Sequence, residues 1–130
     1  MNPENVLIRP ALDVDRSQVW RLVRAFAHAY VANESVFATN FSDLIDRPDT
    51  LVSVAELDAK VIGCLLASYH GTFFANGSVV WIEEVLVAKS LRETSVGRSL
   101  MARAEERATA LPTSVTIVGE SSIRRFLSET

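Results

Sequence analysis

Residues 79–100 read VVWIEEVLVAKSLRETSVGRSL, and this stretch decides the fold. Its first half is a nearly continuous apolar run, typical of a buried strand, interrupted by the adjacent acids Glu83 and Glu84. From Val96, apolar residues recur at helical spacing, at Leu100, Met101, Ala104 and Ala108. A strand that leads through small residues into a helix N-terminus can bind an anion through backbone amides. We therefore expect a strand, an anion-binding turn and a helix.

Glu83 and Glu84 are candidate general bases, because a carboxylate beside a bound substrate can accept a proton. Adjacent residues of a strand point to opposite faces, so in a sheet covered by helices each acid would face a helical layer or a cleft. A buried, unpaired carboxylate costs several kcal/mol, so each would need an arginine partner, a water-lined cleft or a raised pKa. A structural ion pair with Arg21 or Arg24 is the alternative to a catalytic role.

Size and composition indicate one globular domain over residues 1–130, because 48% of the residues are hydrophobic and 22% are charged. The net charge of -3 argues against a nucleic-acid surface, which usually carries a basic patch. No stretch approaches the roughly 20 apolar residues of a membrane span, and the N-terminus does not resemble a signal peptide. We therefore expect a cytoplasmic protein that binds neither nucleic acid nor membrane.

Neither a disulfide nor a metal site is expected. Cys64 is the single cysteine and lies in an apolar run, where a small core residue is a better interpretation than a nucleophile. The two histidines, His28 and His70, are isolated and form no metal-binding motif with Cys64. The phosphate-binding loop Gly-x-x-x-x-Gly-Lys of many ATP-binding proteins is also missing from the sequence.

The remaining patterns predict a mixed sheet with helices on its faces. Strands are expected at residues 6–9, 51–57, 61–69, 79–88 and 114–118. Helices are expected after a capping pair formed by Asp15 and Gln18, at 42–45 as a short one, from Val96 onward and at 121–128. Residues 58–60 should join a hairpin, and strands 79–88 and 114–118 should run parallel around the intervening helix.

Three segments resemble those of one protein family, in the same order along the chain. They are residues 54–63 (VAELDAKVIG), residues 81–87 (WIEEVLV) and residues 92–97 (RETSVG). They are similar to a hairpin, an acid-bearing strand and the Arg/Gln-x-x-Gly-x-Gly/Ala signature of the GNAT superfamily of acyl-CoA-dependent N-acetyltransferases. The element order matches too, so the resemblance covers nearly the whole chain. It implies an α/β (α+β) GNAT-like fold, a mixed central sheet flanked by helices.

The resemblance implies acetyl-CoA as co-substrate and a set of residues that hold it. These cofactor-binding residues are Leu86, Val87, Arg92, Ser95, Val96, Gly97, Arg98 and Ser99. The strand edge at Leu86 and Val87 would pair with the pantetheine of CoA, and a backbone N–H near Val87 would hold the oxyanion. The turn and its Arg98 would hold the pyrophosphate. By the family pattern, Glu83 is the first choice as general base and Glu84 the second.

The sequence departs from the family pattern in three places. Ser95 replaces the first glycine of the signature, and an ordinary strand–turn–helix junction in which Ser95 caps the helix is the alternative to a cofactor site. The last helix carries Leu127 where the family often has a tyrosine that acts as general acid. The chain stops at Thr130, so we expect the family's usual last two strands to be lacking. A second subunit in a homodimer could complete the sheet.

These features together predict an enzyme that transfers an acetyl group from acetyl-CoA to a primary amine by direct attack. The acceptor would be a small-molecule or peptide amine, and residues 33–49 and 71–77 would select it. The alternative is a non-catalytic GNAT-like module that binds CoA or acyl-CoA, or a protein partner.

Overall fold

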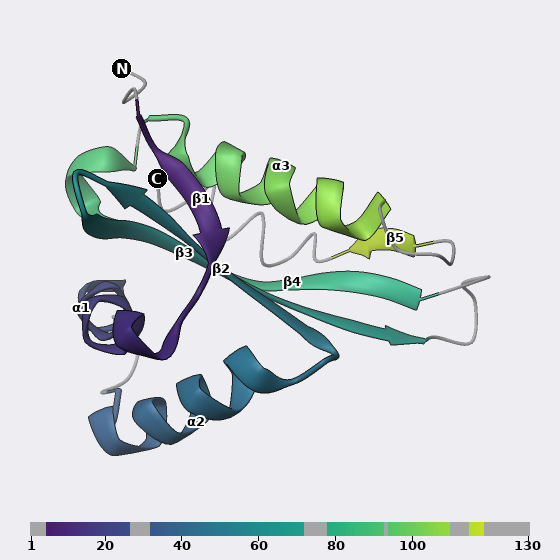
Figure 1. Cartoon of the computed structure of the whole chain (residues 1–130), viewed down its shortest axis with the longest axis horizontal. Helices are drawn as coiled ribbons and strands as arrows, with labels where there is room; N and C mark the ends of the chain where they lie inside the picture. Colours follow the sequence, from purple (N-terminus) through teal and green to yellow (C-terminus); the bar gives the residue numbers. More distant parts are fainter. Residues whose placement is uncertain (1–4, 27–31, 72–77, 93, 110–114, 119–130) are drawn as a thin grey trace.

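A five-stranded sheet forms the centre of the protein (Figure 1). The computed structural model describes residues 5–26, 32–71, 78–92, 94–109 and 115–118. The strands lie side by side in chain order: β1 (Leu7–Pro10), β2 (Thr50–Leu57), β3 (Lys60–Gly71), β4 (Ser78–Val87) and β5 (Val115–Val118). The first four are antiparallel to their neighbours, whereas β4 and β5 are parallel. The predicted parallel pair is therefore confirmed.

Helices cover both faces of this sheet, as predicted (Figure 1). Helices α1 (Arg16–Phe26) and α2 (Glu34–Asp46) pack on one face, and α3 (Val96–Thr109) packs on the other. Two short 3-10 turns, η1 (Asp13–Asp15) and η2 (Lys89–Leu91), precede α1 and α3. Each face has its own apolar core, because the buried apolar residues of the sheet pack against the helices on the face to which they point.

The hairpin between β2 and β3 forms where it was predicted, with a tighter turn. Leu57 pairs with Lys60, so only Asp58 and Ala59 make the turn. Their φ angles are 51° and 64°, the left-handed values that a two-residue hairpin turn of type I′ requires at both positions. The turn fixes the register of β2 against β3 and therefore the place of β4 beside them.

Residues 33–49 differ from the prediction of a mostly irregular segment with a short helix at 42–45. They form the thirteen-residue helix α2, which Asn33 caps by accepting a hydrogen bond from the Val36 amide at 3.0 Å. Phe37, Phe41 and Ile45 recur every four residues and pack into the core below α2. This stripe packs the helix on the sheet, and the same stripe was readable in the sequence.

The predicted capping pair of α1 is wrong. Asp15 is 2% exposed and accepts two hydrogen bonds from Arg9, at 2.8 and 2.9 Å, and one from the Leu12 amide at 2.8 Å. Gln18 instead accepts a hydrogen bond from the Val61 amide at 2.9 Å and ties α1 to β3. Asp15 therefore anchors β1 to the turn before α1. The predicted helix at 121–128 and the expected shortened sheet edge fall outside the described residues and stay predictions.

Candidate active site

A β-bulge interrupts β4 at the acid pair. Leu66 of β3 pairs with Glu84, whereas the next residue, Ala67, pairs with Ile82, so Glu83 is an extra residue on β4. Before the bulge, Ile82 packs in the core under α3. After it, Val85 packs in that same core, although an unbroken strand would have turned it to the opposite face. The bulge therefore shifts the alternation of β4 by one residue.

Glu83 and Glu84 lie on the same face of the sheet because of this shift. Glu84 lines a pocket on the α2 side, together with Leu66 of β3. Glu83 accepts a hydrogen bond from the Ser68 hydroxyl at 3.2 Å, and Ser68 shares the face of Leu66 because it lies two residues further along β3. The prediction that the two acids point to opposite faces is wrong. Both carboxylates are exposed to solvent, so neither has the burial cost that the sequence suggested.

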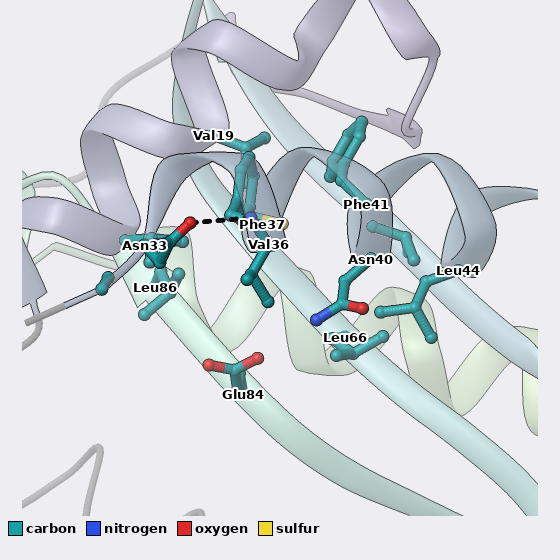
Figure 2. A pocket seen from close by; sticks show the side chains of 14 residues that line it. Val19, Asn33, Val36, Phe37, Asn40, Phe41, Leu44, Leu66, Glu84 and Leu86 are labelled. Carbon is teal, nitrogen blue, oxygen red and sulfur yellow. Dashed lines mark hydrogen bonds between the residues drawn. The ribbon is translucent and has the colours of Figure 1, made fainter.

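The pocket beside Glu84 has a volume of about 260 Å³ and lies between the sheet and helices α1 and α2. Figure 2 shows α2 with Val36, Asn40 and Leu44 on one side and Glu84 of β4 on the other. The residues that line it are Val19, Val23, Ala32, Asn33, Val36, Phe37, Asn40, Phe41, Leu44, Val52, Cys64, Leu66, Glu84 and Leu86. The described walls are apolar except for two asparagines, one thiol and one carboxylate.

Cys64 lines this pocket but is not a nucleophile at neutral pH. Burial, with a contribution from the negative charges of Glu84 and Asp15, raises the pKa of the Cys64 thiol to about 12. A thiol with this pKa is almost fully protonated at neutral pH, and the thiolate is the reactive form. The interpretation of Cys64 as a small core residue fits this environment.

The second half of β4 has an open edge. Pairing with β5 ends at Trp81 and Val118, and among the described residues no strand pairs with β4 beyond that point on this side. Ala88 donates a hydrogen bond to the Ile62 carbonyl at 2.8 Å, which fixes the alternation of the ladder between β3 and β4. Leu86 therefore directs its peptide groups toward β3, whereas Val85 and Val87 direct theirs toward the open edge.

Arg92 lies at the end of this edge. Its Nε donates a hydrogen bond to the Val87 carbonyl at 3.2 Å, and its guanidinium carbon lies 5.0 Å from the centre of the Phe26 ring of α1. Arg92 thus connects β4, the turn and α1. The peptide groups that remain free at the edge, among the described residues, are both groups of Val85 and the N–H of Val87.

The N-terminus of α3 lies just after this turn. The first helical hydrogen bond runs from the Ser99 amide to the Ser95 carbonyl at 2.9 Å, so Val96, Gly97 and Arg98 form the first turn. The Thr94 hydroxyl accepts a hydrogen bond from the Val96 amide at 3.4 Å. No side chain within the described ranges accepts one from the other two amides. They carry partial positive charge and can bind an anion.

Gly63 of β3 lets this turn pack closely on the sheet. A Cβ at this position would lie 3.1 Å from Leu100 Cδ1, 3.2 Å from Val96 Cγ1 and 3.3 Å from the Leu86 carbonyl oxygen. A Cβ here would require these neighbours to move by a few tenths of an ångström. Gly63 therefore positions the free amides beside the open edge, a role that the sequence did not reveal.

Other residues considered from the sequence lie elsewhere. Tyr69 packs against the core under α3, so it lies on the sheet face opposite the pocket. Burial raises the pKa of its hydroxyl group. His70 is exposed near the end of β3. Among the described residues, no group of three or more His, Cys, Asp or Glu could hold a metal ion, and no helix is long and apolar enough to cross a membrane.

Comparison with known proteins identifies the fold and the family. The model of the acetyltransferase (GNAT) family matches residues 17–121. The GNAT family acetyltransferase of Staphylococcus aureus subsp. aureus USA300_TCH1516 has a TM-score of 0.73 at 18% identity, over 88% of this chain and 86% of that chain. The aminoglycoside antibiotic 6'-N-acetyltransferase of Acinetobacter baumannii has a TM-score of 0.78 at 18% identity, over 96% and 88%.

A third similar structure is an aminoglycoside N-acetyltransferase in complex with CoA. Its TM-score is 0.76 at 16% identity, over 96% of this chain and 85% of that chain. Identities this low show the fold alone, so the substrates of these proteins do not transfer to this chain. No curated protein matches the chain in sequence.

Proposed function

The chain belongs to the acetyltransferase (GNAT) family, and we propose that it transfers an acetyl group from acetyl-CoA to a primary amine by direct attack. One observation carries this proposal. The two acids, the open edge of β4 and the free amides of α3 meet within one strand–turn–helix segment, between Glu83 and Arg98. A proton acceptor thus lies beside peptide groups and amides that can bind a cofactor.

The residues at this segment fit CoA. The free amides of Gly97 and Arg98 can hold a phosphate, and the exposed Arg98 side chain adds a positive charge. The peptide groups of Val85 and Val87 can pair with the amides of the pantetheine, as an added strand would. Leu86 would contribute its side chain, since its peptide groups face β3. Bound acetyl-CoA supplies the acetyl thioester.

Glu84 is the residue we favour as proton acceptor. A primary amine has a pKa near 10.4, is protonated at neutral pH and must lose a proton before it can attack. Glu84 lines the pocket where such an amine would lie, and Glu83 is not among the described residues that line it. The order of preference from the sequence is therefore reversed, with Glu83 as the second choice.

The transfer balances without a covalent enzyme intermediate. The amine nitrogen forms a bond to the acetyl carbonyl carbon, and the carbon–sulfur bond of the thioester breaks. The sulfur leaves with the bonding electron pair. The ammonium group loses two protons in all: one passes to Glu84 or to water, and the other passes through solvent to the sulfur, which becomes the thiol of CoA. The N–H of Val87 points to the open edge and can stabilise the negative charge that develops on the carbonyl oxygen.

A non-catalytic module that binds CoA is the second candidate. The half-buried Ser95 favours it, because glycine stands at this place in the family signature and allows a closer approach to phosphate. The aminoglycoside acetyltransferases of the same fold favour the enzyme, since they act on small-molecule amines. The two candidates differ only in turnover.

Two measurements separate these candidates. Calorimetric titration of acetyl-CoA, CoA and a pantetheine without pyrophosphate tests the binding site, and we expect micromolar binding that needs the pyrophosphate. Release of free thiol from acetyl-CoA in the presence of primary amines tests the transfer. Binding without amine-dependent thiol release would support the non-catalytic module, and absence of binding would contradict both candidates.

A further inference from the structure

The pocket beside Glu84 contains one charged group in an apolar setting. Among the described residues that line it, Asn33, Asn40 and the protonated Cys64 are the uncharged polar ones, and the Asn33 side-chain oxygen already accepts a hydrogen bond from the Val36 amide. All other lining residues are apolar, from α1, α2 and the three strands beneath them. Figure 2 shows the apolar side chains of α2 facing Leu66 and Leu86 across the pocket.

This composition disfavours a ligand with several positive charges. Each cation that enters an apolar site loses hydration and needs a partner to offset the loss, and the described part of the walls offers one carboxylate, Glu84. An aminoglycoside carries several ammonium groups and many hydroxyl groups, which these walls would leave without partners. A ligand with one ammonium group and an apolar body matches this lining, since the ammonium group can lie at the carboxylate while the body covers the apolar walls.

The exposure of Val36 indicates where the apolar part of such a ligand would lie. Val36 is 57% exposed, although it lines the pocket and belongs to the first turn of α2. An apolar side chain at the mouth of an apolar pocket remains in water until a ligand covers it. A ligand whose apolar part extends from Glu84 toward α2 would bury Val36.

The pocket also reaches the reacting centre. Glu84 directly precedes Val85 in β4, so the two Cα atoms lie about 3.8 Å apart. The side chain of Glu84 enters the pocket, and the peptide groups of Val85 face the open edge. An ammonium group held at Glu84 would therefore lie next to the edge that we assign to the cofactor.

We propose that the acceptor is a primary monoamine with an aliphatic or aromatic substituent, which fills the pocket between α2 and the sheet while its amino group lies at Glu84. This inference rests on the proposed acetyl transfer and narrows it to one class of amine. The pocket of about 260 Å³ suits the body of a small molecule.

The first test compares propylamine, butylamine and hexylamine with kanamycin as acceptors, in a thiol-release assay with acetyl-CoA. Each methylene that enters the pocket should raise kcat/KM about fourfold. Its burial contributes the transfer free energy of one methylene group to transition-state binding, and this lowers the activation free energy by the same amount at each step of the series. Kanamycin should be acetylated at a lower kcat/KM than hexylamine. A flat series, or a preference for kanamycin, would overturn the inference while leaving the acetyl transfer intact.

Val36→Asp tests whether the pocket under α2 is responsible, with Ser35→Asp as the matched control. Both residues are exposed and lie in the first turn of α2, where an added carboxylate suits the helix dipole, so both variants should fold. Val36→Asp should lower kcat/KM for hexylamine about tenfold and change that for propylamine little. Ser35 does not line the pocket, so its variant should behave as the wild type. Equal effects of the two variants would contradict the assignment.

A binding measurement separates this inference from the proposed transfer. Hexylamine and kanamycin are titrated calorimetrically into the protein saturated with CoA. Binding of hexylamine that weakens in Val36→Asp, without thiol release from acetyl-CoA, would support the ligand class and refute the transfer. Absence of hexylamine binding, together with no thiol release for any of the amines tested, kanamycin included, would refute both. Leu66→Ala should shift the preferred chain length upward, because it removes half-buried side-chain volume from the pocket wall.

Discussion

The two halves of β4 differ in what lies along their outer edge. From Ser78 to Trp81 the strand is paired on both sides, with β3 and with β5. From Glu83 to Val87 the strand is paired with β3 only, and its other edge is open among the described residues. A single extra residue, Glu83, lies at the junction. The comparison teaches that the bulge marks the boundary between a half that is paired on both sides and the half to which we assign the cofactor.

The first prediction concerns the acid in the open half. Glu84→Gln should lower kcat about 100-fold or more and leave the affinity for acetyl-CoA unchanged, because a general base acts on the amine and not on the cofactor. Steady-state kinetics and calorimetry measure the two quantities. Glu83→Gln is the matched control and should have the smaller effect. A greater loss in Glu83→Gln would assign the base to the bulge residue itself.

The second prediction concerns the amides that follow the open half. Gly97→Glu should weaken CoA binding about 100-fold, because its carboxylate would repel the phosphate at the first turn of α3. Arg98→Glu tests the same repulsion at an exposed position where folding is not at risk, and Arg98→Gln removes the charge alone. We expect Arg98→Glu to bind CoA most weakly, Arg98→Gln to bind it with intermediate affinity and the wild type to bind it most tightly. If Gly97→Glu and Arg98→Glu both bind CoA as the wild type does, the pyrophosphate is not bound at this turn.

The third prediction concerns the closed half. Val80 is fully buried, and Val80→Ala should lower the free energy of unfolding by about 2 to 3 kcal/mol, because it removes two methyl groups from the core under α3. The affinity for CoA should remain that of the wild type. Urea denaturation and calorimetry measure the two effects. A large loss of CoA affinity in the folded variant would show that the two halves are coupled.

The fourth prediction uses a group remote from both halves. The Arg9 guanidinium, through hydrogen bonds, holds the pKa of Asp15 below its usual value. The folded protein therefore binds the Asp15 proton less readily than the unfolded chain, whose value is about 3.9. The ionised Asp15 carboxylate therefore stabilises the folded protein fully at pH values above the unfolded-state pKa. This stabilisation is lost as the pH falls from there through the lower, folded-state pKa.

Asp15→Asn measures this effect. It should cost about 2 kcal/mol of unfolding free energy at pH 7, and the difference from the wild type should shrink as the pH falls below about 4. Urea denaturation at several pH values gives the difference. A cost that stays constant between pH 7 and pH 3 would mean that the Asp15 carboxylate contributes nothing through its charge.

The sequence was sufficient for features that depend on local patterns. The apolar run before Glu83, the helical spacing from Val96 and the turn at Asp58 are each set by near neighbours, and the structure has them. The parallel pairing of β4 and β5 follows from the handedness of strand–helix–strand units. The family also followed from these patterns, since the motifs resembled it in order.

The features that the sequence did not reveal depend on distant partners. The bulge at Glu83 arises from the register of β3 against β4, which no residue of β4 specifies alone. Asp15 looked like a helix cap because its true partner, Arg9, lies in β1. The pocket beside Glu84 needs α2, whose stripe of Phe37, Phe41 and Ile45 was not recognised. The site therefore became visible only when strands and helices were placed together.

Residue-specific amide hydrogen exchange, with and without acetyl-CoA, tests the open edge of β4 most directly. Without ligand, the amides of Val85 and Val87 should exchange quickly, whereas those of Leu86 and Glu84, bonded to β3, should be protected. Acetyl-CoA should protect Val85 and Val87 and change the other two little. Protection of Val85 and Val87 already without ligand, or no change on its addition, would contradict the assignment of this edge to the cofactor.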